Sequence, residues 1–300
     1  MTIALNNQEK PTNNRHSRLG VEVLQGRDIT TLTTKEIKQL KQSLWQKGVV
    51  IIKRQNLKAS QLREFALKTF GNRIFGKAAI EIDPDIDPNL QTPGVRILGN
   101  PKGIAKDKIE QKKLNRKWHQ DGNRLTNLET LEVNSLCAVM DYGAKIPLQG
   151  QKGYPQTTDF IDLLEAYNNL EYSIKRQLDR MYLTHDRPIL PAAKTNQEEC
   201  QEKIHPIVST HKITGKKGLY LGEETATLVG MKHRQKEAKE FWQQLLTLIL
   251  ACTPVYTHVW QPGDVVLWDN SQVMHRSSFY EIGKSQHVAL RVEVVDESDA

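Results

Sequence analysis

The sequence predicts a single α+β domain over residues 17–300, behind a polar, disordered tail at residues 1–16. Apolar residues recur at helical spacing in several segments before residue 251, and the period changes to that of strands after it. No internal repeat or low-complexity linker divides the chain. The segments richest in candidate site residues lie near residues 120 and 275, so one fold has to bring them together.

The first predicted elements are a helix and a strand. The helix begins after Thr33 or Thr34 and ends at Gly48, because glycine readily adopts the backbone conformation that closes a helix. Its apolar face consists of Ile37, Leu40 and Leu44. Residues 49–52, VVII, form a continuous apolar run that predicts a buried strand.

A second helix, a loop and a strand follow. Apolar residues at helical spacing between residues 62 and 69 predict the helix, which Gly71 closes. Several Asp and Pro residues predict a loop at residues 80–90. Residues 131–140 predict a strand.

The second half of the chain begins with helical patterns and ends with strands. Apolar side chains recur at helical spacing over residues 159–183, and residues 241–250 predict a strongly apolar helix. After that helix we expect strands at residues 256–260, 265–268 and 288–295, with a turn at residues 261–264.

The composition limits the environment and the partners. No stretch approaches the roughly 20 apolar residues of a membrane span, and residues 1–18 lack the apolar core of a signal peptide. Three widely spaced cysteines predict reduced thiols in a cytoplasmic protein. The net charge of +7 favours an anionic or carrier-bound small molecule as the substrate, and a homo-oligomer remains open.

The densest basic stretch covers residues 102–117. Charge runs are usually solvated loops, and the alternative is a mobile lid that attracts an anionic substrate. The stretch has no aromatic residue before Trp118, whereas proteins that bind single strands need aromatic side chains for base stacking. We therefore expect no nucleic-acid partner.

The candidate site consists of two histidines and a carboxylate. His119 and Asp121 lie two residues apart in the run WHQDG, so both side chains point to the same side of an extended segment. His275 must come from a strand that lies beside them. Each residue alone is more often structural, but two histidines and one carboxylate together hold Fe(II) on one face and leave three positions open.

The motifs of the chain resemble the TauD/TfdA family of Fe(II)/2-oxoglutarate-dependent dioxygenases. The resemblance starts at Leu19 and extends over about nine-tenths of the chain, with the motifs in the family's order. They are LGVEVL at 19–24, the helix-then-strand segment at 44–52, WHQDG at 118–122, TDF at 158–160 with AY at 166–167, HPIV at 205–208, THKITG at 210–215 with LY at 219–220, and GD at 263–264 with WDN at 268–270 and His275.

The resemblance implies a double-stranded β-helix, a mostly β jelly-roll or cupin-like barrel with flanking helices. It also implies that His119, Asp121 and His275 bind Fe(II), that 2-oxoglutarate is the co-substrate, and that O2 is the oxidant. The implied reaction decarboxylates 2-oxoglutarate to succinate and CO2 while it oxidises a C–H bond of a small molecule, most simply by hydroxylation. Desaturation, cyclisation or another oxidative rearrangement on the same iron are alternatives.

The distal carboxylate of 2-oxoglutarate needs a cationic partner, and a guanidinium meets a carboxylate with two parallel hydrogen bonds. Many family members carry two arginines four residues apart on the last strand, whereas this chain has His287 at the first place and Arg291 at the second. We predict that Arg291 binds this carboxylate, and the resemblance adds the hydroxyl of Thr158. In the alternative, His287 binds it and Arg291 binds an anionic group of the substrate.

Other polar and aromatic residues near the motifs have simpler roles. We expect Trp118 and Trp268 to pack and to shield the site from water. We expect His205 and His211 to be structural, because the ligand set is complete without them. Two further function classes remain: a non-oxidative metal-dependent enzyme on the same barrel, and an inactive binding module.

Overall fold

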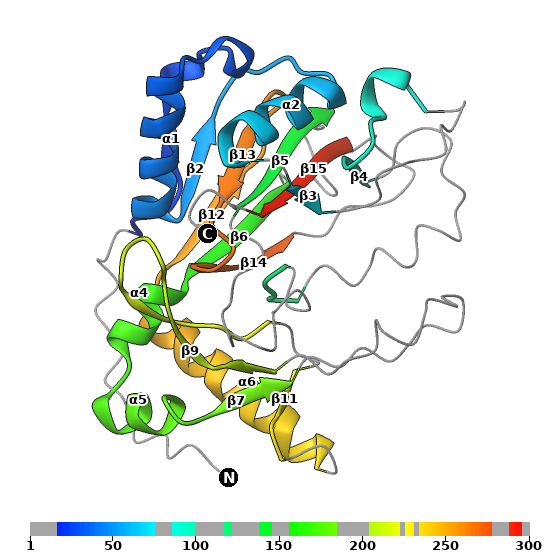
Figure 1. The fold of residues 1–300 in the computed structure, drawn as a ribbon. Helices are drawn as coiled ribbons and strands as arrows, with labels where there is room; N and C mark the ends of the chain where they lie inside the picture. Colours follow the sequence, from blue (N-terminus) through cyan, green and yellow to red (C-terminus); the bar gives the residue numbers. More distant parts are fainter. Residues whose placement is uncertain are drawn as a thin grey trace.

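The computed structural model describes residues 17–71, 73–75, 86–99, 117–121, 138–145, 156–184, 204–222, 226–230, 234–277 and 288–295 (Figure 1). Five expectations from the sequence lie wholly or mostly outside these residues: the tail at 1–16, the loop at 80–90, the basic stretch at 102–117, the strand at 131–140, and His287.

The first helix and strand confirm the sequence prediction. Helix α1 spans Thr34–Lys47, and the side chains of Thr33 and Glu36 cap its N-terminus reciprocally. Gly48 ends it with a φ of 73°, and strand β2 follows directly at Val49–Ile52. Helix α2 spans Ala59–Phe70, and Gly71 ends it as predicted.

A seven-stranded sheet forms the centre of the fold. Its order is β1-β2-β13-β5-β15-β3, and β4 also pairs with β15. The strands are β1 (Val21–Glu22), β3 (Arg73–Phe75), β4 (Arg96–Gly99), β5 (Ala138–Lys145), β13 (Val265–Trp268) and β15 (Val288–Val295), in addition to β2. The predicted strands at 265–268 and 288–295 are therefore confirmed, and the one expected at 131–140 overlaps β5 from residue 138 onward.

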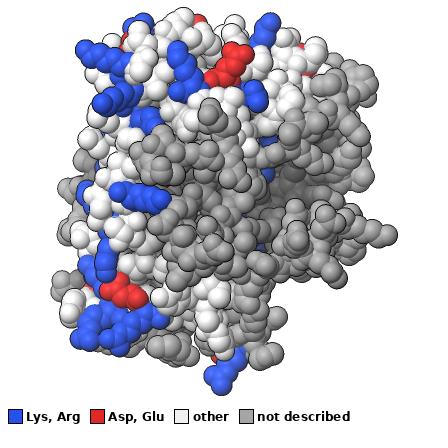
Figure 2. Space-filling view, in the orientation of Figure 1, with Lys and Arg blue, Asp and Glu red and all other residues white. Residues whose placement is uncertain are grey.

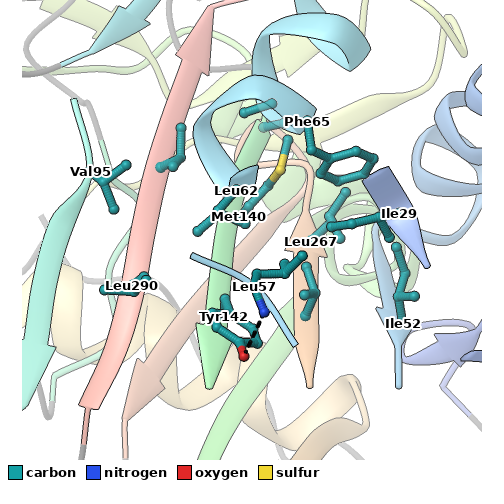
Figure 3. Close-up of a cluster of buried hydrophobic side chains, with 14 of the residues drawn as sticks. Ile29, Ile52, Leu57, Leu62, Phe65, Val95, Met140, Tyr142, Leu267 and Leu290 are labelled. Atoms are coloured by element: carbon teal, nitrogen blue, oxygen red, sulfur yellow. Dashed lines mark hydrogen bonds between the residues drawn. The ribbon is translucent and has the colours of Figure 1, made fainter. Parts of the chain in front are cut away.

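The outer face of this sheet packs against α1 and α2. Alternate residues of the strands point to this side, and they form one buried apolar cluster with the helices. Figure 3 shows Met140 of the sheet close to Leu62 of α2, and Leu290 and Phe65 belong to the same cluster. In the same cluster, the Leu57 amide donates a hydrogen bond of 3.1 Å to the hydroxyl of Tyr142 (Figure 3).

A three-stranded sheet packs against the inner face. Its order is β12-β6-β14, and its strands are β6 (Thr157–Asp162), β12 (Val255–Val259) and β14 (Val273–Ser277). Phe160 of β6 and Val273 of β14 share a buried cluster with Val266 and Trp268 of the larger sheet. The candidate site lies beside this interface, because His275 of β14 contacts the rings of Phe160 and Trp268.

The remaining elements pack below the two sheets in Figure 1, around a third apolar cluster. The helices are α4 (Leu163–Asn169), α5 (Tyr172–Leu178) and α6 (Gln235–Cys252). The strands are β7 (Tyr182–Thr184), β8 (Ile204–Pro206), β9 (Val208–Thr210), β10 (Lys217–Leu219) and β11 (Thr227–Leu228). Three short 3-10 helices complete the described elements and pack against the first apolar cluster instead: η1 (Leu24–Gly26), η2 (Ile29–Thr31) and η3 (Pro88–Leu90).

The prediction of a helical segment at residues 159–183 is wrong at its start. Residues 157–162 form the central strand of the smaller sheet, where neighbours on both sides satisfy the backbone. The helix begins only after Asp162, whose carboxylate accepts hydrogen bonds from the Leu164 and Glu165 amides. Local spacing did not reveal that two distant strands pair with this segment.

The fold therefore mixes helices with sheets, as expected, but no sheet closes into a barrel within the described residues. Among those residues, no helix is long and apolar enough to cross a membrane. Figure 2 shows more Lys and Arg than Asp and Glu side chains on the described surface of one face, in keeping with the net charge of +7.

Candidate metal centre

The two predicted histidine ligands lie side by side. His119 and His275 form an isolated antiparallel bridge, in which each amide donates to the carbonyl of the other residue at 3.0 and 2.9 Å. The centroids of the two imidazole rings are 4.2 Å apart. The expectation that His275 comes from a strand beside His119 is thus confirmed.

Asp121 lies two residues after His119 and points to the same place. Its Oδ1 is 3.8 Å from Nε2 of His119, and its Oδ2 is 3.5 Å from Nε2 of His275. Each of the three side chains offers one ligand atom, and these atoms all lie within 4.8 Å of one another. The three residues can therefore share one metal ion.

The protonation of the two rings suits a metal. Nδ1 of His119 lies 2.8 Å from the Lys117 carbonyl, which can only accept, so this nitrogen carries a proton, and in the neutral ring Nε2 is left with the lone pair that binds a metal. The ring of His275 is buried, and neither of its nitrogens has a hydrogen-bond partner in the described part of the chain. Buried polar atoms normally have a partner, and a metal ion would provide one for Nε2.

Burial keeps His275 neutral, and a nearby positive charge keeps Asp121 ionised. Burial, followed by the nearby charge of His119, lowers the pKa of His275 well below its ordinary value. Burial raises the pKa of Asp121, but the positive charge of Arg291 is the main opposing influence, and the pKa stays below its ordinary value. A neutral imidazole and a carboxylate are the forms that bind a metal.

Two amide side chains hold the turn that carries Asp121. Asn270 accepts a hydrogen bond of 2.9 Å from the Asp121 amide and donates another to the Asp121 carbonyl. The side chain of Gln120 is 2% exposed, accepts from the Leu221 and Gly222 amides, and donates to the Asn270 carbonyl. The middle residue of the H-x-D motif therefore joins the turn to two other segments.

Aromatic rings enclose His275, as expected for Trp268. The centroid of the Trp268 ring is 4.8 Å from that of His275, and the Phe160 centroid is 6.0 Å away. Trp268 and Phe160 have no exposed surface. They keep water away from one side of the imidazole and restrict its rotation. Trp118 is also buried, and the guanidinium carbon of Arg276 lies 4.6 Å from the centre of its ring.

Arg291 points into the same interface, but its guanidinium already has carboxylate partners. Its Nε and Nη2 donate to the two oxygens of Asp141 at 2.7 and 2.8 Å. Its Nη1 donates to Oδ2 of Asp121 at 2.9 Å. The predicted site residue thus lies next to the metal centre, and the fork that we expected to bind 2-oxoglutarate is engaged by Asp141.

A second ion pair lies beside this one. Glu293 follows Arg291 by two residues on β15, so it points to the same face, where it pairs with Arg96 of β4. Burial raises the pKa of Glu293 to about 7, and the charge of Asp121 acts in the same direction.

The other predicted residues lie at different distances from the centre. Thr158 belongs to β6, two residues from Phe160, and its hydroxyl oxygen accepts a hydrogen bond of 2.9 Å from the Trp260 indole. His211 is structural, as expected: its ring contacts Asp269 and Thr214 at 2.8 Å. His205 is fully buried, and its ring packs 4.8 Å from that of Tyr220.

Sequence reasoning missed Asp141, Gln120 and Asn270. The one available signal was the position of Asp141 within the run AVMDYG, because a charged residue inside a buried strand normally has a charged partner. Gln120 and Asn270 gave no such signal, since amides are common in turns.

The chain matches a family model and several characterised proteins. The model described as "Taurine catabolism dioxygenase TauD, TfdA family" matches residues 8–291. The (S)-phenoxypropionate/alpha-ketoglutarate-dioxygenase of Sphingobium herbicidovorans is 24% identical over 258 residues, which cover 80% of each chain. The alpha-ketoglutarate-dependent 2,4-dichlorophenoxyacetate dioxygenase of a Burkholderia species is 25% identical over 263 residues, 84% of this chain and 83% of that one.

Solved structures share the fold. A taurine dioxygenase from Burkholderia xenovorans superposes with a TM-score of 0.65 at 21% identity and covers 93% of this chain and 88% of its own. AAD-2 in complex with Mn(II) and N-oxalylglycine superposes with a TM-score of 0.70 at 21% identity, over 94% of this chain and 97% of its own. Since the family model matches nearly the whole sequence, the chain belongs to the TauD/TfdA family of dioxygenases, enzymes that use Fe(II), 2-oxoglutarate and O2.

Proposed function

We propose that the chain hydroxylates a C–H bond of a small anionic molecule while 2-oxoglutarate is decarboxylated to succinate and CO2. In this proposal His119, Asp121 and His275 bind the iron. The observation that carries it is the meeting of these three side chains, remote in sequence, with their ligand atoms within 4.8 Å of one another.

The iron, together with bound 2-oxoglutarate, would supply the oxidising chemistry. The protein's own residues then have simpler tasks. His275 presents a neutral nitrogen, and Asp121 supplies the negative charge. Trp268 and Phe160 exclude water from one side of the centre.

The contacts of Arg291 bear on which residue binds the distal carboxylate of 2-oxoglutarate. Asp141 occupies the Nε/Nη2 fork and Asp121 takes one N–H of Nη1, so a third carboxylate would find only two of the five N–H groups of Arg291. These contacts count against Arg291 as the anion-binding residue in both alternatives, and they leave His287 as the candidate for the distal carboxylate of 2-oxoglutarate. The hydroxyl of Thr158 accepts a hydrogen bond from Trp260 and can still donate one to the co-substrate.

We also propose that the two facing sheets are parts of a jelly-roll barrel, a double-stranded β-helix, within one domain from residue 17 onward. The packing of Phe160 and Val273 against Trp268 supports this arrangement of sheets. The likeness to the taurine dioxygenase structure supports it as well.

The relatives and the charge support an anionic substrate. The phenoxypropionate and 2,4-dichlorophenoxyacetate dioxygenases are named for carboxylates, and a relative from Saccharomyces cerevisiae is named a sulfonate dioxygenase. The net charge of +7 attracts such molecules, and it would equally attract an acidic carrier that bears the substrate.

The test is succinate production. Purified protein is incubated in air with Fe(II), 2-oxoglutarate and a panel of aryloxycarboxylates, sulfonates and alkyl sulfates. We expect succinate in proportion to oxidised substrate for at least one class, and none with His275→Ala. His258→Asn is the matched control, because His258 is a buried histidine on β12, in the same sheet as His275, and contacts Asp264 outside the centre.

Product analysis separates the alternatives. Mass spectrometry distinguishes a product that has gained an oxygen atom from one that has lost two hydrogens, so hydroxylation and desaturation give different results. Substrate turnover without O2 or 2-oxoglutarate would refute the oxygenase proposal in favour of a non-oxidative metal enzyme. Tight metal binding without any 2-oxoglutarate binding would indicate an inactive module.

A further inference from the structure

The inner face of the larger sheet carries charges where an apolar surface would be expected. On β5, Ala138, Met140 and Tyr142 belong to the outer apolar cluster, so Asp141 points inward. On β15, Leu290 and Val292 likewise point outward, and Arg291 points inward.

Asp141 and Arg291 are direct partners in the antiparallel ladder between β5 and β15. Both side chains are buried. The register therefore fixes their separation, and two parallel hydrogen bonds of 2.7 and 2.8 Å fix the plane of the guanidinium.

This plane determines where the third nitrogen of Arg291 points. With Nε and Nη2 held by Asp141, Nη1 lies 2.9 Å from Oδ2 of Asp121. The guanidinium also lies over the Trp268 ring, with its carbon 5.0 Å from the ring centre, which limits other orientations.

The geometry points to Asp141 as a positioning residue that acts through Arg291 on the metal ligand Asp121. The assignment rests on the proposed iron site. Arg291 binds Oδ2 and thereby fixes the rotation of the carboxylate, with Oδ1 presented on the side of His119. Asp141 has an electrostatic role too, because an uncompensated guanidinium beside a divalent cation would repel it.

One consequence separates this role from that of an anion-binding arginine. If Arg291 holds Asp121, loss of its guanidinium weakens metal binding and leaves the affinity for 2-oxoglutarate unchanged once metal is saturating. If Arg291 holds the distal carboxylate of 2-oxoglutarate, the same substitution lowers the affinity for 2-oxoglutarate and leaves metal binding intact.

The test measures Mn(II) binding to the metal-free protein by electron paramagnetic resonance, without any turnover. We expect Asp141→Asn to bind Mn(II) roughly 10–100-fold more weakly than wild type, the usual effect of losing a residue that orients a metal ligand. Asp141→Glu keeps the charge and should recover part of this loss. The double variant Asp141→Asn/Arg291→Met should bind no more weakly than Arg291→Met alone, since Asp141 acts through Arg291.

Asp264→Asn is the matched control. Asp264 is an equally buried aspartate, paired with Lys53 at 2.8 Å and away from the centre. It should lower the melting temperature as Asp141→Asn does, with Mn(II) affinity unchanged. This comparison separates a general loss of stability from a specific effect on the metal.

Three results would overturn the inference: wild-type Mn(II) affinity in Asp141→Asn, equal losses in both aspartate variants, or additive losses in the double variant. If Asp141→Asn does not fold, Arg291→Lys replaces it, because lysine keeps the charge but cannot bridge Asp141 and Asp121. Wild-type Mn(II) affinity in that variant would also refute the role. A wild type that binds Mn(II) but makes no succinate would refute the proposed function, while the Mn(II) results would still decide the role of Asp141.

Discussion

The substitution Gln120→Met tests whether the middle residue of the H-x-D motif holds the turn in place. Methionine has nearly the shape of glutamine but makes none of its hydrogen bonds. The change removes the bonds from the Leu221 and Gly222 amides, at 2.8 and 3.2 Å, and the bond to the Asn270 carbonyl, at 3.0 Å. All three partners are left in a buried environment.

The expected loss follows from these contacts. A neutral hydrogen bond contributes about 1 kcal/mol net, and a buried partner left unsatisfied adds to the loss. Three such bonds at a side chain that is 2% exposed predict that Gln120→Met lowers the free energy of unfolding by roughly 2–4 kcal/mol. Local opening should increase as well, so the Leu221 and Gly222 amides should exchange with solvent faster than in wild type.

Urea denaturation of the metal-free protein gives the free energy, and hydrogen exchange gives the local effect. Gln61→Met is the control, because Gln61 accepts one exposed hydrogen bond of 2.8 Å from the Lys58 amide at the start of α2. Its substitution should lower the free energy by less than about 1 kcal/mol. Equal losses in the two variants, with unchanged exchange of the two amides, would refute the proposed role of Gln120.

Three further predictions concern stability. Because burial lowers the pKa of His275 below 6.5, the ring takes up a proton when the protein unfolds at lower pH. Below pH 6.5 the free energy of unfolding of the metal-free wild type should therefore fall more steeply than that of His275→Gln, by up to about 1.4 kcal/mol per pH unit. Parallel slopes for the two proteins in urea denaturation would contradict this. Burial raises the pKa of Glu293 from 4.5 to about 7, so its negative charge destabilises the fold as the pH rises through this range. In thermal unfolding, Glu293→Gln should have a higher free energy of unfolding than wild type, and the difference should grow with pH to at most about 3 kcal/mol at pH 8. A difference that does not depend on pH would count against this. Gly263→Ala should lower the free energy of unfolding by about 2–4 kcal/mol, since φ is +85° and the new methyl group would lie 2.7 Å from the Gln55 carbonyl oxygen. Gly215→Ala is the control, because its φ is +66° and no atom lies within 4 Å of the new methyl group. This variant should lower the free energy of unfolding by only about 1 kcal/mol.

The helices and strands with strong local signals were predictable. Thr33 and Gly48 delimit α1, and the apolar run at 49–52 forms β2, because capping and hydrophobic periodicity act over a few residues. The segment at 157–162 was not predictable in this way. It is a strand because β12 and β14 lie on either side of it, and neither is near it in sequence.

The sequence by itself indicated the side chains of the proposed centre: two imidazoles and one carboxylate, in motifs typical of a family of iron-dependent oxygenases. Only the tertiary structure decided the surroundings of Arg291. A guanidinium binds a carboxylate of a ligand and a carboxylate of the chain in the same way. An arginine in the sequence therefore does not reveal which of the two is its partner. Strand register placed Asp141 opposite Arg291, and this contact between distant segments has no local signature in the sequence.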